Sequence, residues 1–411
     1  MGRIQILQVQ YGDAIIIECG RGDKKGIIVV DGGPTTSSDY FLEVIRDLPT
    51  IDLMVLTHYD EDHIGGILSL VYDCLDNQTP LPVKEIWANC ARYVPMVSST
   101  RTSPGQGVDL AKYLTGFVAN GDLVWRDRIS EGYCGNDIPF AEIEVVSPTV
   151  EVMNMSIKKQ EVEDGAPTKA TARTNADLQT SLDDLAKRNT KAPDLTKDSQ
   201  LANAASIAFV LRCDEFSVLM LGDCYPQNVE AYLRGKGWSE DHPFEVDFVK
   251  VSHHGSRNNT SNGLMDIIKC NKFIISTNGG DGRYAHPDRE TFAHILCHPK
   301  RNKEERVHFY MNYSLEEITT NGAPFLNDGE KVGTGIMHIN ITSLTEELLV
   351  PALGKYVALF KDGKKVSATV YPGAVQLVDL DLSKAGEYEL VVSAVDYYGF
   401  VCNNKYTITV E

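Results

Sequence analysis

The chain has 411 residues, of which 43% are hydrophobic and 23% charged, a composition typical of soluble globular proteins, and it is long enough for two domains. Its net charge of −18 argues against sequence-independent binding of duplex nucleic acid, which needs a basic face. Because no apolar run is long enough to cross a bilayer and the start lacks the order of a signal peptide, we expect a cytoplasmic protein without membrane contact.

The first 150 residues predict alternating strands and turns. Short apolar runs predict strands over 3–9, 14–19, 26–31, 52–57, 85–90 and 142–148. Between the third and fourth runs, Phe41, Leu42, Ile45 and Leu48 have helical spacing.

After about residue 200 the same pattern returns. We predict strands over 206–213, 216–223, 247–255, 272–278 and 307–312, and helices near 226–237 and 288–298. A strand-rich α/β domain with two similar halves is therefore expected. Between the halves, residues 151–200 have few apolar residues, which is typical of a solvated polar insertion or of a lid over a site.

The texture changes again near residue 345. Asp362 and Gly363 form a hairpin signal, and the alternating residues 386–410 predict two paired strands. We interpret 345–411 as a small β-sandwich of immunoglobulin or fibronectin type, a kind of module that often binds protein partners.

The stretch VLTHYDEDHIGG, residues 55–66, places four ionisable side chains directly after a strand-like run: His58, Asp60, Asp62 and His63. Such a group is favourable in a buried turn only if a positive charge lies among its members, so a divalent cation is expected. The alternative is a polar turn that caps a helix beginning at residue 67. The following Gly65 and Gly66 predict a close approach of another backbone segment.

Further candidate ligands also end apolar runs: Asp31, Asp223, His253 and His254. Functional sites of α/β proteins usually lie at the carboxyl ends of strands. Four such ends that carry Asp or His predict a two-metal site, in which one carboxylate bridges the ions. Imidazole and carboxylate together suit zinc or manganese, and magnesium is a further candidate.

The motifs VDGG, THxDxDHxGG, LxLGD and SHHGS, in this order, resemble the metallo-β-lactamase superfamily. Residues 12–14, Asn203 with Ser206, and His286 with Pro287 make the chain similar to the soluble hydrolase domain of the ComEC/Rec2 DNA-uptake family. This resemblance covers about residues 1–320. It implies an α/β fold, an αββα sandwich over 1–340. The small all-β sandwich expected at 345–411 from the pattern of the tail would follow this domain.

The resemblance also implies a ligand set. His58 and Asp60 would hold one cation, Asp62 and His63 the other, with Asp223 bridging both and His253 completing the second. Many members have histidine where this chain has Asp60, and Asn203 and Ser206 stand in place of a further histidine. Both departures favour manganese or magnesium over zinc at the first cation.

Other roles follow from the same resemblance. Asp31 is expected to orient a ligand rather than bind metal. Asp62 would orient the attacking water, and His286 or His254 would lie near the scissile group. Ser256 and Lys250 are candidates for phosphate contact, although a cap or surface role fits them equally well.

The leading hypothesis is a metal-dependent phosphodiesterase or nuclease whose substrate is a nucleotide or a short nucleic acid. Hydrolysis of a lactone, a thioester or a β-lactam is an alternative on the same fold. A third possibility is a non-catalytic metal site in a protein that acts by binding a partner.

Overall fold

The computed structural model describes most of the chain up to residue 342 and four strands beyond it. The described ranges are 2–21, 24–90, 106–135, 138–162, 179–280, 285–302, 305, 307–313, 317–320, 323–324, 339–342, 354–361, 364–371, 386–395 and 401–410.

Two mixed sheets form the framework of the structure. The first runs in spatial order β1 (Arg3–Ile6), β2 (Ile15–Arg21), β3 (Lys24–Val30), β4 (Ile51–Leu56), β5 (Val83–Ala88) and β6 (Val124–Arg126). The second runs in spatial order β18 (Ile339–Thr342), β15 (Val307–Met311), β14 (Lys272–Ile275), β12 (Phe248–Lys250), β10 (Ser217–Met220), β9 (Ala208–Arg212), β8 (Glu142–Ser147) and β7 (Cys134–Gly135). Two short strand pairs accompany them, β11 (Phe244–Glu245) with β13 (Ile268–Lys269) and β16 (Thr319–Thr320) with β17 (Ala323–Pro324).

The two sheets are built alike. In each, antiparallel strands come first along the chain, β1 to β3 in one and β7 to β10 in the other. Parallel strands then continue each sheet, β4 to β6 in the first and β12, β14, β15 and β18 in the second. The expectation of two similar halves in a mixed α/β domain is thus confirmed.

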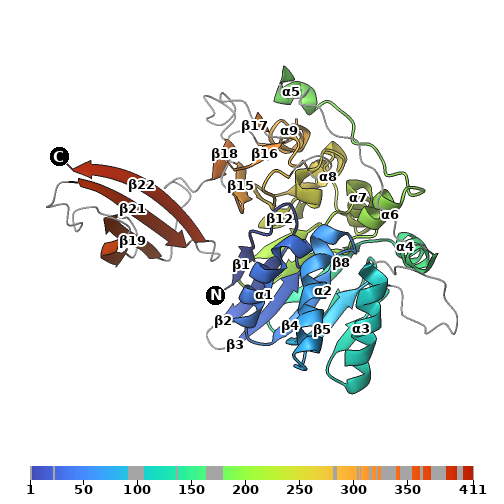
Figure 1. Ribbon diagram of the computed structural model, residues 1–411. Helices are drawn as coiled ribbons and strands as arrows, with labels where there is room; N and C mark the ends of the chain where they lie inside the picture. The colour runs from blue at the N-terminus through green and yellow to red at the C-terminus, as the bar shows by residue number, and fades with distance from the viewer. Residues whose placement is uncertain are drawn as a thin grey trace.

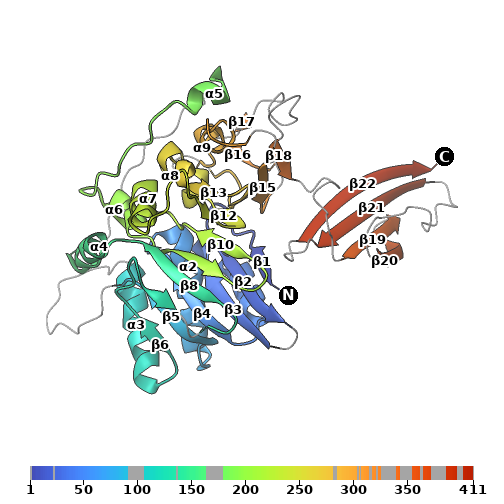
Figure 2. The same ribbon diagram turned by 180° about the vertical axis from the view of Figure 1, so that it is seen from behind.

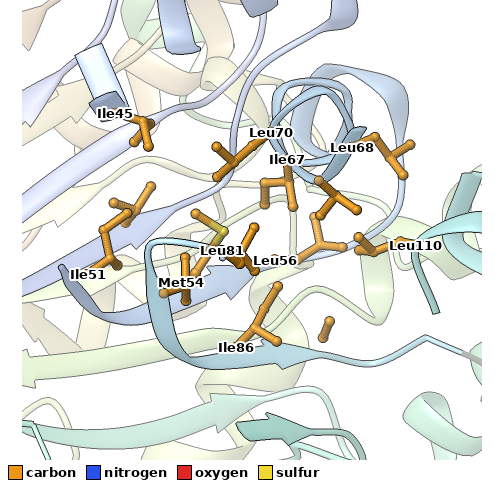
Figure 3. Packing of buried hydrophobic residues seen from close by; sticks show 14 of the residues in the cluster. Ile45, Ile51, Met54, Leu56, Ile67, Leu68, Leu70, Leu81, Ile86 and Leu110 are labelled. Carbon is orange, nitrogen blue, oxygen red and sulfur yellow. The ribbon is translucent and has the colours of Figure 1, made fainter. Parts of the chain in front are cut away.

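Helices cover the outer face of each sheet (Figures 1 and 2). The helices are α1 (Ser38–Arg46), α2 (Glu61–Asp76), α3 (Gln106–Asn120), α4 (Val150–Val162), α5 (Leu182–Leu185), α6 (Asp198–Ala204), α7 (Pro226–Gly235), α8 (Asn262–Ile267) and α9 (Arg289–Leu296). Apolar side chains of α1, α2 and α3 pack on the first sheet (Figure 3), and those of α5, α7, α8 and α9 pack on the second.

A third apolar cluster lies between the two sheets. Along β2, Ile15 and Ile17 belong to this inner cluster, while Ile16 belongs to the outer cluster beneath the helices. Phe209 and Val210 of β9 divide between the inner and outer clusters in the same way. Because successive side chains of a strand point to opposite faces, strands buried on both faces read as continuous apolar runs. The resulting order of layers is helix, sheet, sheet, helix.

Within the polar insertion, residues 151–200, the segment 182–188 packs against the second half. Leu182 and Leu185 are buried in the outer cluster of the second sheet. Arg188 Nη1 donates a hydrogen bond to Glu290 Oε1 of α9 over 2.6 Å. The role of the insertion as a lid stays a prediction. The domain boundaries at 340 and 345 also stay predictions.

A histidine in this region predicts acid sensitivity. His294 of α9 is buried, and its Nδ1 donates to Asn262 Oδ1 over 2.9 Å. Burial, with a smaller effect of His298, lowers the pKa of His294 to about 4. The unfolded chain therefore binds a proton below about pH 6.5 that the folded chain does not, so stability falls as the pH drops from about 6.5 towards 4.

We expect this histidine to reduce the free energy of unfolding by about 2 kcal/mol between pH 7 and pH 5. The His294→Gln variant, whose amide can still donate to Asn262, should lose that part of the pH dependence. Urea denaturation of both proteins at the two pH values measures it. Equal losses in both proteins would contradict the assignment.

Beyond residue 342, the described strands form one antiparallel sheet. Its spatial order is β20 (Lys364–Tyr371), β19 (Gly354–Lys361), β21 (Gly386–Val395) and β22 (Val401–Val410). β19 and β20 flank the expected hairpin turn, and β21 pairs with β22 as expected. The described residues here make a single sheet, so the β-sandwich stays a prediction.

Candidate metal centre

The candidate ligands come from strand ends of both sheets. Asp31 follows β3, His58 follows β4, and Asp223 follows β10 after a two-residue turn. The turn Ser252–Gly255 follows β12. Since β3 is parallel to β4 and β10 is parallel to β12, these carboxyl ends meet at one edge of each sheet.

The helix after β4 begins earlier than its apolar residues suggest. α2 starts at Glu61 rather than at residue 67, so Asp62 and His63 lie in its first turn and not in a loop. Gly66 N donates to Gly33 O over 2.9 Å, and a Cβ atom on Gly66 would lie 2.1 Å from Gly32 O. The predicted close approach at the two glycines is therefore present.

Asp223 is the centre of the arrangement. Its Oδ2 lies 3.8 Å from His58 Nε2 and 3.5 Å from His253 Nε2. Its Oδ1 lies 3.4 Å from His63 Nε2 and 4.0 Å from His254 Nε2. We call these five residues, together with Asp60 and Asp62, the Asp223 cluster.

Asp60 and Asp62 lie on different sides of the cluster. Asp60 Oδ2 is 3.7 Å from His58 Nε2, and its side chain is 37% exposed. Asp62 Oδ2 is 3.5 Å from His254 Nε2, in a buried position. It is thus His254 that accompanies Asp62 and His63, while His253 reaches the opposite oxygen of Asp223.

Local backbone geometry separates the two adjacent histidines. His253 and His254 both have positive φ, 49° and 52°, in the left-handed region that residues other than glycine rarely occupy. The turn is closed by Ser256 N, which donates to His253 O over 2.8 Å. Two successive left-handed residues are costly and direct neighbouring side chains to different sides.

Each imidazole has an oxygen acceptor at Nδ1. Asp31 Oδ2 accepts from His63 over 2.8 Å, and Thr57 Oγ1, which itself donates to Asp31, lies 3.1 Å from His58. Asn259 Oδ1 accepts from His253 over 3.1 Å, and Ser276 O accepts from His254 over 2.9 Å. Because every Nδ1 has an oxygen acceptor, Nε2 is the atom of each ring that is available to a cation.

The residues fit a bound cation. His58 Nε2, His63 Nε2, His254 Nε2 and Asp223 Oδ1 are buried and make no hydrogen bond. Buried polar atoms are normally paired, so several unpaired ones around a single carboxylate fit a bound positive charge among them. Nitrogen and carboxylate donors together suit zinc or manganese.

The pKa shifts within the Asp223 cluster also bear on cation binding. Burial alone would raise the pKa of Asp223, but the imidazoles of His253 and His63 hold it well below its usual range. Burial alone would lower the pKa of His63, but neighbouring carboxylates, Asp223 first, raise it well above its ordinary value. Burial alone would lower the pKa of His254, but the carboxylates of Asp13, Asp62 and Asp223 together raise it to about 9. A cation must therefore displace protons, so its binding weakens as the pH falls.

The polar residues of the missing histidine motif support the cluster. Ser206 Oγ accepts from Asp223 N over 3.2 Å, so it holds the central carboxylate in place. Asn203 is buried, with its side-chain amide 3.3 Å from His253 Nδ1. Ser256 is also buried, and its described hydrogen bonds are those of its backbone.

His286 lies beside the cluster. Its ring centre is 4.8 Å from that of His253, and its Nδ1 lies 3.6 Å from Asp288 Oδ2. Asp288 also accepts from Arg257 N over 2.8 Å. The structure thus brings His286 next to the cluster without a contact to Asp223 among the interactions described.

Three residues at the site were not assigned there from the sequence. Thr57 and Asn259 hold histidines, and Asp13 lies with His63, Asp223 and His254 in a group whose ligand atoms are within 4.8 Å of one another. For Asp13 the signal is Lys250, a charged residue inside an otherwise apolar strand. A buried lysine needs an opposite charge.

One family model matches a part of the chain that includes candidate ligands. The model of the Metallo-beta-lactamase superfamily matches residues 8–73, which include Asp31 and the stretch from His58 to His63. The match supports the metallo-β-lactamase superfamily. That superfamily indicates a metal-dependent hydrolase, in agreement with the candidate cation cluster. No curated protein matches the sequence.

Solved structures of metallo-β-lactamases are also similar, at low identity. One from Cronobacter sakazakii with a HARLDQ motif is 9% identical, with 54% of this chain and 62% of that chain covered and a TM-score of 0.24. One from Staphylococcus aureus is 10% identical, with 59% and 52% covered and a TM-score of 0.25. At such low TM-scores they add nothing to what the family model shows.

The described helices include none that is long and apolar enough to span a bilayer.

Proposed function

We propose that this chain is a metal-dependent phosphodiesterase that hydrolyses nucleotides or short single-stranded nucleic acid. The observation that carries the proposal is the convergence of four imidazole Nε2 atoms on the two oxygens of Asp223. Lactone, thioester or β-lactam hydrolysis remains the rival on the same fold.

The distances divide the ligands into two groups that share Asp223. The first group, around Oδ2, holds His58, Asp60 and His253. The second, around Oδ1, holds Asp62, His63 and His254. We therefore assign His254 to the second cation and His253 to the first.

When bound, two divalent cations would polarise the phosphoryl oxygens and lower the pKa of the attacking water. Asp62 would accept a hydrogen bond from that water and orient it. His286, which lies beside His253 and near Asp288, would give a proton to the leaving oxygen.

Two features favour a phosphodiester over a neutral ester. Asp60 supplies a hard oxygen ligand in place of an imidazole, which suits manganese or magnesium, the usual partners of phosphates. The net charge of −18 repels long polyanions, so a small or single-stranded substrate is favoured.

The test uses chelator-stripped protein that is supplied separately with manganese, magnesium or zinc. Probes are bis(p-nitrophenyl) phosphate, a short DNA strand, p-nitrophenyl acetate and a β-lactam. We expect manganese to restore cleavage of the first two, and Asp62→Asn to reduce it by at least about 100-fold. Asp76→Asn, at the exposed end of the same helix, is the matched control and should keep full activity.

Activity restricted to the ester or the β-lactam would replace the phosphodiesterase with the rival. Folded protein that binds metal and cleaves none of the four probes would favour the non-catalytic hypothesis.

A further inference from the structure

A buried ion pair adjoins the Asp223 cluster. Lys250, the last residue of β12, is fully buried, and its Nζ contacts Asp13 Oδ2. The two side chains are 1% and 2% exposed. A buried ion pair seldom stabilises a fold more than apolar residues of similar size, so stability alone does not account for it.

The second oxygen of Asp13 faces a cluster histidine. Asp13 Oδ1 lies 3.5 Å from His254 Nδ1 and makes no hydrogen bond of its own. The same Nδ1 donates to Ser276 O, and Ser276 Oγ donates to Gly12 O over 3.0 Å. Asp13 and Ser276 therefore lie on the Nδ1 side of the His254 ring, and Ser276 is itself bound to the backbone next to Asp13.

A carboxylate also lies at Nδ1 of His63, where Asp31 Oδ2 accepts a hydrogen bond over 2.8 Å. In both cases a carboxylate lies at Nδ1, and Nε2 of the same ring is directed at Asp223 Oδ1. A carboxylate in this position fixes the ring orientation and makes Nε2 a stronger donor to metal. Both imidazoles that face Asp223 Oδ1 thus have a carboxylate on their Nδ1 side, hydrogen-bonded for His63 and at 3.5 Å for His254.

Asp13 is poorly suited to bind a cation itself. Although its oxygen lies within 4.8 Å of ligand atoms of His63, Asp223 and His254, the ammonium group of Lys250 is already in contact with its carboxylate. A cation bound there would be repelled by that ammonium group. The lysine thus balances the charge of Asp13 and leaves one oxygen for His254.

The loop that carries Gly12 and Asp13 also contacts the backbone of the first turn of α2. Asp13 N donates to Asp62 O over 3.2 Å, and Gly33 N donates to Asp13 O over 2.7 Å. A Cβ atom on Gly12 would lie 2.2 Å from Asp62 O. The Asp13 loop therefore contacts the backbone of one ligand of the second cation as well as the ring of another.

We propose that Asp13, held by Lys250, is a positioning residue for the second cation, acting through His254 and Asp62. This inference rests on the proposed function only in assuming that the cluster binds two cations. Loss of the Asp13–Lys250 pair should weaken binding of the second cation and leave binding of the first unchanged. The reason is that His58, Asp60 and His253 have no described contact with Asp13.

The experiment is a titration of chelator-stripped protein with manganese, in which calorimetry and electron paramagnetic resonance measure the binding of each ion. The variant is Asp13→Asn with Lys250→Met, which removes both charges and leaves no unpaired buried ion. We expect the second manganese to bind about 10- to 100-fold more weakly and the first as in the unmodified protein. The control is Asp73→Asn with Arg46→Met, which removes an ion pair on the outer helices and should bind both ions normally.

A milder variant guards against misfolding. Ser276→Ala removes the hydrogen bond to Gly12 O and should weaken the second manganese by a smaller factor in the same direction. A folded double variant with unchanged binding of both ions would overturn the proposal, as would equal weakening of both. If the double variant does not fold, unchanged binding by Ser276→Ala overturns it instead. Failure of the unmodified protein to bind manganese would count against the proposed function itself.

Discussion

Replacement of Asp223 by asparagine is expected to reduce hydrolysis by about 1,000-fold or more, which corresponds to about 4 kcal/mol of transition-state stabilisation. The carboxylate is the only described group that lies near all four imidazole Nε2 atoms of the cluster. Asparagine keeps the shape but offers one neutral oxygen and an N–H donor. The substitution would therefore weaken the binding of both cations.

Metal content after dialysis and turnover of bis(p-nitrophenyl) phosphate measure this effect. Asp214→Asn, at the exposed turn between β9 and β10, is a matched control that should keep both. An Asp223→Asn protein that retains two tightly bound ions would show that the carboxylate is not their bridge.

Gly66→Ala is expected to destabilise the fold by about 3 kcal/mol or more and to remove cation binding at the same time. The new Cβ atom would lie 2.1 Å from Gly32 O, a backbone atom that cannot turn aside as a flexible side chain can. α2 would have to move away from the loop after β3. That movement would separate His63 from Asp31, whose contact is 2.8 Å.

Gly116→Ala is the matched control for this prediction. Gly116 lies within α3, is exposed, and has no atom within 4 Å of an added Cβ. This substitution should stabilise the protein by roughly 0.5–1 kcal/mol, because alanine favours helix. Chemical denaturation and manganese binding separate the two variants. Equal stability of Gly66→Ala and the unmodified protein would mean that the contact of α2 with Gly32 is not required.

Residues adjacent in the sequence revealed most of the candidate site. His58, Asp60, Asp62 and His63 fall within six positions, and the apolar run before them indicates a strand, so local patterns suffice to place them together. The same reasoning predicts Asp223 and the two histidines at 253 and 254, each after its own strand. It also predicts the close approach at Gly66, because glycine repeats mark positions where a side chain does not fit.

Several features depended on residues far apart in the chain. The pairing of Asp13 with Lys250 spans 237 positions, and no local pattern links them. The start of α2 at Glu61 was also missed, since polar residues in a first turn do not show the apolar spacing on which helix prediction rests.

The sequence by itself determined the main strands of both sheets, the mixed α/β class and the candidate metal ligands, because these follow from hydrophobic periodicity and from residue types at strand ends. Only the tertiary structure decided which ligand faces which oxygen of Asp223. The left-handed backbone at His253 and His254 sends one ring to Oδ2 and the other to Oδ1. A repeated residue type carries no information about such directions, since they are set by φ and ψ and by the groups packed behind each ring.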